Sequence, residues 1–140
     1  MFLSVYILLL TGCGTQTTSY EYTDEVIESI GNLQEGEIEL SSITSFQWDE
    51  VCVFKPYTSK DGVKEAIGCK PKEYRTTVSE TDTLVYFLKE QEIVCCVIGS
   101  FDDLGFYMNY NFDDYYDKLD NSTIIKVKII DDKKSVELIR

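Results

Sequence analysis

The stretch Phe46–Gly68 constrains the fold most, because it joins a buried strand directly to a helix. Val51–Phe54 is apolar at every position, which is the pattern of a strand covered on both faces. Thr58 or Ser59 then suits the start of a helix, since a short hydroxyl side chain accepts a hydrogen bond from a free N–H in the first turn. Gly68 suits its end. The stretch therefore predicts a central strand followed by an amphipathic helix.

Apolar runs elsewhere predict further strands. Thr83–Leu88 and Ile93–Ile98 are nearly continuous apolar runs joined by a polar turn, which predicts a hairpin of interior strands. Ser122–Ile130 alternates, with Ile125, Val127 and Ile129 expected inward and edge lysines outward, and Ser135–Ile139 is expected to pair back on it. Glu37–Leu40 alternates over a shorter length and predicts an edge strand.

Two other stretches complete the predicted domain. Asp24–Ile30 places its apolar residues on one helical face and is followed by Gly31, which predicts a short helix. Gly99–Asn121 is aromatic and acidic without a clean period, which favours a long loop or an irregular strand. We therefore predict one α+β domain over residues 23–140, an antiparallel sheet of about five strands with one or two short helices packed on it.

Composition excludes several functions. The chain has 140 residues, with 13 Lys and Arg against 25 Asp and Glu, a net charge of −12. Nucleic-acid binding needs clustered Lys and Arg, so we expect no nucleic-acid partner. Histidine is absent, which rules out Ser-His-Asp and Cys-His nucleophile systems within this chain and argues against a metal site. We predict no metal and no cofactor.

The N-terminus carries the clearest functional motif. The apolar run Phe2–Leu10 is about half the ~20 residues that a membrane-spanning helix needs, and it has the length of a signal-peptide core. Leu10-Thr11-Gly12-Cys13 follows it and resembles the bacterial lipobox, although no Lys or Arg precedes the apolar run. The resemblance implies that Cys13 is diacylated and becomes the first residue of the mature protein. The alternative is a buried N-terminal strand with an ordinary cysteine.

This motif predicts the organisation and location of the chain. Residues 1–12 would be a lipoprotein signal peptide. Residues 13–22 would be the lipidated cysteine and a polar tether rich in Thr, Ser and Gln. The expected location is the extracytoplasmic face of a cell membrane, reached through the lipid on Cys13.

A second resemblance lies inside the domain. Trp48-Asp49-Glu50-Val51, followed by Phe54, Pro56, Tyr57 and Thr58, resembles a pattern in small uncharacterised lipoproteins of Gram-positive bacteria. The resemblance covers roughly Leu40–Ile98. It implies a lipid-anchored extracellular domain, and it carries no activity.

Trp48, Asp49 and Tyr57 are the candidate ligand-binding residues. They offer aromatic walls and one carboxylate for a small pocket at the end of the predicted strand. The competing interpretation is structural: the indole of Trp48 packs, Asp49 caps or pairs locally, and the residues around Pro56 turn the chain.

Four cysteines and an acidic segment are further candidate sites. Four thiols remain if Cys13 is lipidated: Cys52, Cys69, Cys95 and Cys96. Outside a cell they could form two disulfides, for which three pairings are possible. The alternative is that they stay buried as free thiols. Cys95 and Cys96 should point to opposite faces of a strand. An acidic segment matches a calcium-binding loop poorly because Asp114 replaces the required glycine; its candidate ligands are Asn109, Asn111, Asp113, Asp117 and Asp120.

These patterns favour a non-enzymatic, lipid-anchored cell-surface domain that binds an envelope protein or a small ligand. The first alternative is an inhibitor or an envelope-maintenance protein. The second is a carboxylate-based hydrolase that uses Asp49, or Asp102 with Asp103, and an adjacent acidic pair is weak support for it.

Overall fold

The computed structural model describes residues 16–75 and 77–140. The predicted signal peptide and the lipidation site at Cys13 lie outside the described residues. The predicted tether lies partly inside them, because helix α1 begins at Gln16.

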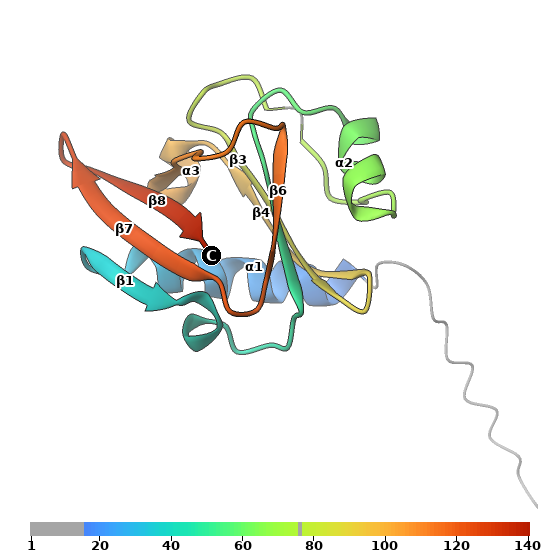
Figure 1. Ribbon diagram of the computed structural model, residues 1–140, viewed down its shortest axis with the longest axis horizontal. Helices are drawn as coiled ribbons and strands as arrows, with labels where there is room; N and C mark the ends of the chain where they lie inside the picture. Colours follow the sequence, from blue (N-terminus) through green and yellow to red (C-terminus); the bar gives the residue numbers. More distant parts are fainter. Residues whose placement is uncertain (1–15, 76) are drawn as a thin grey trace, which may run out of the picture.

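The described strands form two four-stranded sheets (Figure 1). Sheet A has the order β1-β7-β8-β5, with bounds Gly36–Glu39, Ile124–Ile130, Lys133–Ile139 and Phe106–Met108. Sheet B has the order β4-β3-β2-β6, with bounds Glu92–Gly99, Thr83–Lys89, Glu50–Phe54 and Tyr116–Asp120. The helices are α1 (Gln16–Gly31), the 3₁₀ helix η1 (Leu40–Ile43), α2 (Lys60–Ile67) and α3 (Phe101–Leu104).

The α+β class is confirmed, but the expectation of a single antiparallel sheet of about five strands is wrong. Strand β5 also pairs with β8 in parallel. The difference arises in Gly99–Asn121, expected to be a loop or an irregular strand, which holds α3, β5 and β6. A three-residue strand is too short to show a period, and β6 is an edge strand with a mostly polar sequence.

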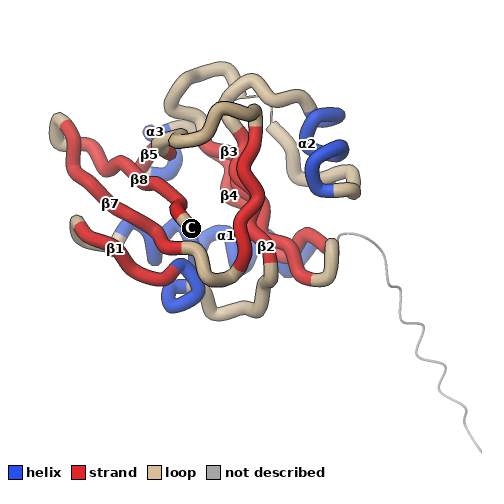
Figure 2. The backbone as a smooth tube through the Cα atoms, in the orientation of Figure 1, coloured by secondary structure: helices blue, strands red, loops and turns tan. Residues whose placement is uncertain are grey.

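Sheet B is buried on both faces (Figure 2). Val53 and Phe87 face the core shared with sheet A and α1, whereas Phe54 and Tyr86 face the smaller core under α2. This double burial explains why its central strands are apolar at consecutive positions. The predictions of a central strand at Val51–Phe54 and of a hairpin after it are confirmed, but only β3 of the hairpin is interior, because β4 is an edge strand of sheet B.

Sheet A is buried on one face only. Ile125 and Val127 point into the larger core, and Lys126 and Lys128 alternate with them, as predicted. Ile129, expected inward, is 45% exposed because it lies near the end of the sheet. Strand β7 is also not an edge strand, since it pairs with both β1 and β8.

Helices α2 and α3 begin and end at local signals in the sequence. The Ser59 side chain accepts a hydrogen bond from the Gly62 N–H at 3.0 Å and caps α2, and Gly68 ends the helix at a φ of 81°. Ser100 and Asp103 form a capping box on α3. The predicted helix after the central strand is therefore confirmed.

Helix α1 starts eight residues before the predicted helix start at Asp24. Val26 and Ile30 are buried in the larger core, and α1 packs along β4 at the edge of sheet B. At its C-terminal end, the Lys134 ammonium on β8 donates hydrogen bonds to the carbonyls of Ile30, Gly31 and Leu33, at 3.2, 2.6 and 2.8 Å. A cation there also complements the helix dipole. Lys134 therefore ties α1 to sheet A.

Replacing Lys134 with methionine is expected to lower the free energy of unfolding by about 2–3 kcal/mol, because it removes charge-assisted hydrogen bonds to three carbonyls. Urea unfolding of both proteins measures the difference. Lys128→Met is the matched control, since Lys128 is exposed on β7, and it should cost less than about 0.5 kcal/mol. Equal losses in the two variants would contradict the capping role of Lys134.

Thr83 is a buried polar residue with an unsatisfied side chain. It is fully buried at the start of β3, and its hydroxyl has no hydrogen-bond partner among the described residues. It lines an apolar cavity of about 20 Å³ between α1 and the two sheets. A buried hydroxyl without a partner costs free energy, so this position is locally unfavourable.

Thr83→Val keeps the shape of the side chain and removes the unsatisfied hydroxyl, so it is expected to raise the free energy of unfolding by about 1 kcal/mol. Thr123→Val is the matched comparison. Thr123 is equally buried, but its hydroxyl donates to the Asp120 carbonyl at 2.6 Å, and its loss should cost about 1 kcal/mol. Thermal unfolding of the pair should therefore shift in opposite directions; a lower melting temperature for Thr83→Val would refute this interpretation.

Candidate ligand-binding site

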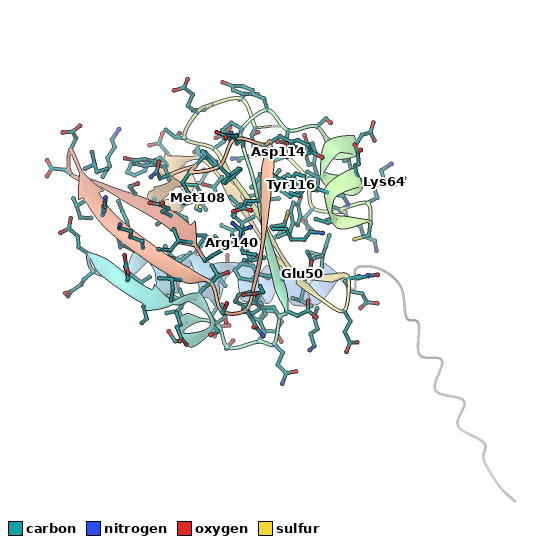
Figure 3. All side chains as sticks on the ribbon, viewed as in Figure 1. Glu50, Lys64, Met108, Asp114, Tyr116 and Arg140 are labelled. Atoms are coloured by element: carbon teal, nitrogen blue, oxygen red, sulfur yellow. The ribbon has the colours of Figure 1, made fainter. Side chains whose placement is uncertain are left out.

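The structure does not bring the three predicted site residues together. Trp48 and Asp49 precede β2, and Tyr57 follows it, so the strand separates them by about 13 Å or more. We call the end of sheet B that carries Trp48, Glu50 and the β3–β4 turn the turn end, and the end that carries Tyr57 and Asp114 the loop end. Figure 3 shows Glu50 and Asp114 at these opposite ends.

Trp48 is largely structural. Its side chain is 5% exposed and packs edge-to-face on Phe87, with ring centroids 5.3 Å apart. The indole N–H donates to the Thr44 hydroxyl at 2.9 Å. The indole therefore has both a polar and an aromatic partner in the fold.

Asp49 also has a structural partner. Its carboxylate accepts a hydrogen bond from the Glu90 N–H at 2.9 Å, which ties the chain before β2 to the β3–β4 turn. Glu90 and Gln91 have φ values of 51° and 69°, a left-handed pair without glycine. This pair is typical of a tight type I′ hairpin turn, and the hydrogen bond that the Glu90 N–H donates to Asp49 helps to hold it.

Tyr57 is the exposed member of the three. Its side chain is 63% exposed, and its φ is 71°, which is uncommon for a residue other than glycine. The Tyr57 N–H donates to the Thr77 hydroxyl at 2.6 Å, and the phenol donates to the Val78 carbonyl at 3.2 Å. These bonds hold the left-handed backbone against the loop that precedes β3.

A hollow of about 590 Å³ opens at the turn end beside Trp48. This volume falls in the range of about 300–1,000 Å³ that is common for small-molecule sites. Three segments line it: η1 with the chain leading to β2, the end of β3, and the β6–β7 turn. Its lining residues are Ser41, Thr44, Phe46, Gln47, Trp48, Lys89 and Asn121.

The chemistry of the hollow differs from that of the chain as a whole. None of its described lining residues is acidic, although the chain carries a net charge of −12. Lys89 supplies its one charge and makes no ion pair with any described residue. Two other hollows, of about 300 and 320 Å³, share the Glu50–Lys118 ion pair, whose atoms are 3.8 Å apart. We therefore take the hollow beside Trp48 as the candidate site.

An aromatic cluster forms one side of this hollow. Phe46 stacks on Tyr22 of α1 with ring centroids 4.5 Å apart, and it meets Phe87 edge-on at 5.5 Å. Phe46 is half-buried, so part of its ring is open to a ligand. Lys89, Asn121 and Phe46 were missed in the sequence, because they come from separate segments and share no local motif.

Cys52, Cys69, Cys95 and Cys96 form no disulfide among the described residues. Cys95 lies in the larger core and Cys96 in the smaller one, which confirms that they point to opposite faces. Tyr86 of β3 pairs with Cys52 of β2 on one side and with Cys96 of β4 on the other. Cys52 and Cys96 are therefore separated by a whole strand. Burial raises the pKa of the Cys52 and Cys95 thiols to about 12 and that of Cys96 to about 11. These three thiols stay protonated at neutral pH.

The acidic segment that was compared with a calcium loop does not converge on one point. The amides of Asn109 and Asn111 donate to the Glu137 carboxylate. Asp117 forms a bidentate pair with Arg140, with the shorter contact at 2.8 Å. Among the described residues, no group of three or more acidic or cysteine side chains is placed to hold a metal ion.

Of the acidic pair Asp102 and Asp103, Asp103 has a structural role. Asp103 accepts hydrogen bonds from the Ser100 N–H and from Arg75, at 3.1 and 3.0 Å. These bonds lower the pKa of its carboxyl group. Asp49, the other carboxylate proposed for such chemistry, is bound to the β3–β4 turn.

Comparison with protein-family models, with curated proteins and with solved structures found no match. Across residues 16–75 and 77–140, no helix combines the length and the hydrophobicity that crossing a membrane requires.

Proposed function

We propose that this chain is a non-enzymatic binding domain, held on the extracytoplasmic face of a cell membrane by lipid on Cys13. The observation that carries the proposal is the motif Leu10-Thr11-Gly12-Cys13 directly after a short apolar run. The resemblance of Trp48–Thr58 to small lipoproteins of Gram-positive bacteria supports the same proposal. The domain would bind an envelope protein or a small ligand at the hollow beside Trp48.

The hollow supports the binding part of this proposal. It combines aromatic surface, side-chain amides and hydroxyls, and one ammonium group that forms no ion pair with the described residues, the mixture that orients small ligands. Two of the three candidate carboxylates, Asp49 and Asp103, are by contrast engaged in turn and capping contacts. This arrangement favours binding over hydrolysis.

Growing cells with an alkyne-labelled fatty acid tests the anchor. The wild-type protein is expected to be labelled and to sediment with membranes, and Cys13→Ala should lose the label and the membrane association completely. Cys69→Ala is the matched control, since Cys69 is a half-buried thiol within the domain, and it should be labelled like the wild type. Unchanged labelling of Cys13→Ala would refute lipidation at Cys13.

Capture from envelope extract tests the binding site. Residues 16–140 contain every residue of both cores, so they serve as bait. A specific partner should be retained by the wild-type domain and by Lys64→Glu, which changes an exposed lysine on α2. The same charge change at Lys89, inside the hollow, should release it. Equal retention by both variants would place the partner elsewhere.

A further inference from the structure

The start of α1 limits how far the domain can lie from its anchor. Only three residue steps separate Cys13 from Gln16, which span at most about 11 Å when fully extended. Tyr22 lies six residues farther along the helix, or about 9 Å. Tyr22 is therefore within about 20 Å of Cys13, whereas a fully extended tether over residues 13–22 would allow about 32 Å.

Helix α1 points its start toward the turn end of sheet B. The Thr23 hydroxyl, in the second turn of α1, contacts Cys95 Sγ and donates to the Cys96 carbonyl in the middle of β4. Farther along both elements, Ile30 and Val97 line the same cavity, so α1 and β4 run in the same direction. The first turns of α1 thus lie at the level of the β3–β4 turn, as Figure 1 shows.

The hollow beside Trp48 lies at this same end. Tyr22 and Phe46 stack on each other, so the first half of α1 is in direct contact with the lining of the hollow. The Lys89 ammonium is the kind of group that pairs with a phosphate.

We propose that the anchored domain rests with its turn end against the headgroup layer of the membrane that holds Cys13, so that the hollow opens onto phospholipid headgroups and Lys89 meets a headgroup phosphate. This inference rests on the proposed lipid anchor. Lipid headgroups are the expected occupant of the hollow because the chain between Cys13 and α1 is short. It cannot carry the turn end far from the bilayer. The loop end, with Tyr57 and Val78, then faces away from the membrane.

General charge attraction does not account for this orientation. Asp49, Glu50 and Glu90 also lie at the turn end, and the net charge of −12 repels anionic lipid. The contact therefore depends on the covalent anchor, with Lys89 as a local partner inside the hollow. The unlipidated domain is expected not to bind the same vesicles.

Quenching of Trp48 fluorescence by lipid tests the orientation, because Trp48 is the only tryptophan of the chain. The acylated protein, with its lipid verified by intact mass, is reconstituted into phosphatidylcholine vesicles that contain a lipid with a headgroup nitroxide. We expect loss of most of the Trp48 signal. A second protein combines Trp48→Phe with Tyr57→Trp and moves the only tryptophan to the loop end, where the signal should be retained.

Three further proteins complete the test. Lys89→Glu should weaken the quenching of Trp48, and the matched change Lys64→Glu on α2 should not. Residues 16–140, added without lipid, should give no quenching. Equal quenching at positions 48 and 57, or stronger quenching at 57, would overturn the orientation while leaving the anchor intact. A protein without lipid on Cys13 would instead refute the proposed function itself.

Discussion

Replacing Trp48 with alanine is expected to lower the free energy of unfolding by about 3–5 kcal/mol, the usual cost of removing a large buried aromatic side chain. The indole is 5% exposed, packs on Phe87 and donates a hydrogen bond to Thr44, so its removal takes away both of these contacts. Urea unfolding at neutral pH measures the change.

Tyr57→Ala is the matched control for Trp48→Ala. Tyr57 is aromatic too, but it is 63% exposed and makes one hydrogen bond through its phenol, so its loss should cost no more than about 1 kcal/mol. If Trp48→Ala and Tyr57→Ala have equal free energies of unfolding, the proposed structural role of Trp48 is refuted. In that case Trp48 would be available for ligand binding at little cost to the fold.

Raising the pH above 9 is expected to destabilise the protein. The buried thiols have folded pKa values of about 12 for Cys52 and Cys95 and about 11 for Cys96, above the ordinary value of 9.0. Below pH 9 both folded and unfolded thiols are protonated, so this contribution to stability is fully present. Between pH 9 and the folded pKa values only the unfolded thiols ionise. Each buried thiol should then remove about 1 kcal/mol of stability per pH unit.

Urea unfolding at pH 8, 9 and 10 measures this slope. Burial also raises the pKa of Tyr86 and Tyr110, which extends the loss above pH 10. Cys95→Ala removes one of the three thiols, so its stability should fall less steeply with pH than that of the wild type. A wild-type stability that stays constant to pH 10 would show that the thiols are not buried in this way.

Much of the fold could be predicted from the sequence because a strand that is buried on both faces has a continuous run of apolar residues. The strands β2, β3 and β4 lie between two cores, so their apolar runs are continuous and their type and place were correct. The caps of α2 were equally readable from Ser59 and Gly68. Helix α1 was predicted too short, because its first residues are polar and carry no apolar period.

The candidate site was predicted less well, for a geometric reason. Trp48, Asp49 and Tyr57 are close in sequence, but an extended strand between them places them at opposite ends of sheet B. The hollow itself needs Phe46, Lys89 and Asn121, which only the pairing of β3 and the β6–β7 turn brings together. Such a set depends on topology, and a local pattern cannot reveal it.

The intact mass of the mature protein tests the proposed anchor most directly. Protein purified from the membranes of a bacterium with lipoprotein processing should begin at Cys13 and carry a diacylglyceryl group on that residue. Its fragment mass should assign the added lipid to Cys13 and to no other cysteine. A chain that retains residues 1–12, or that begins at Cys13 without added mass, would contradict the account.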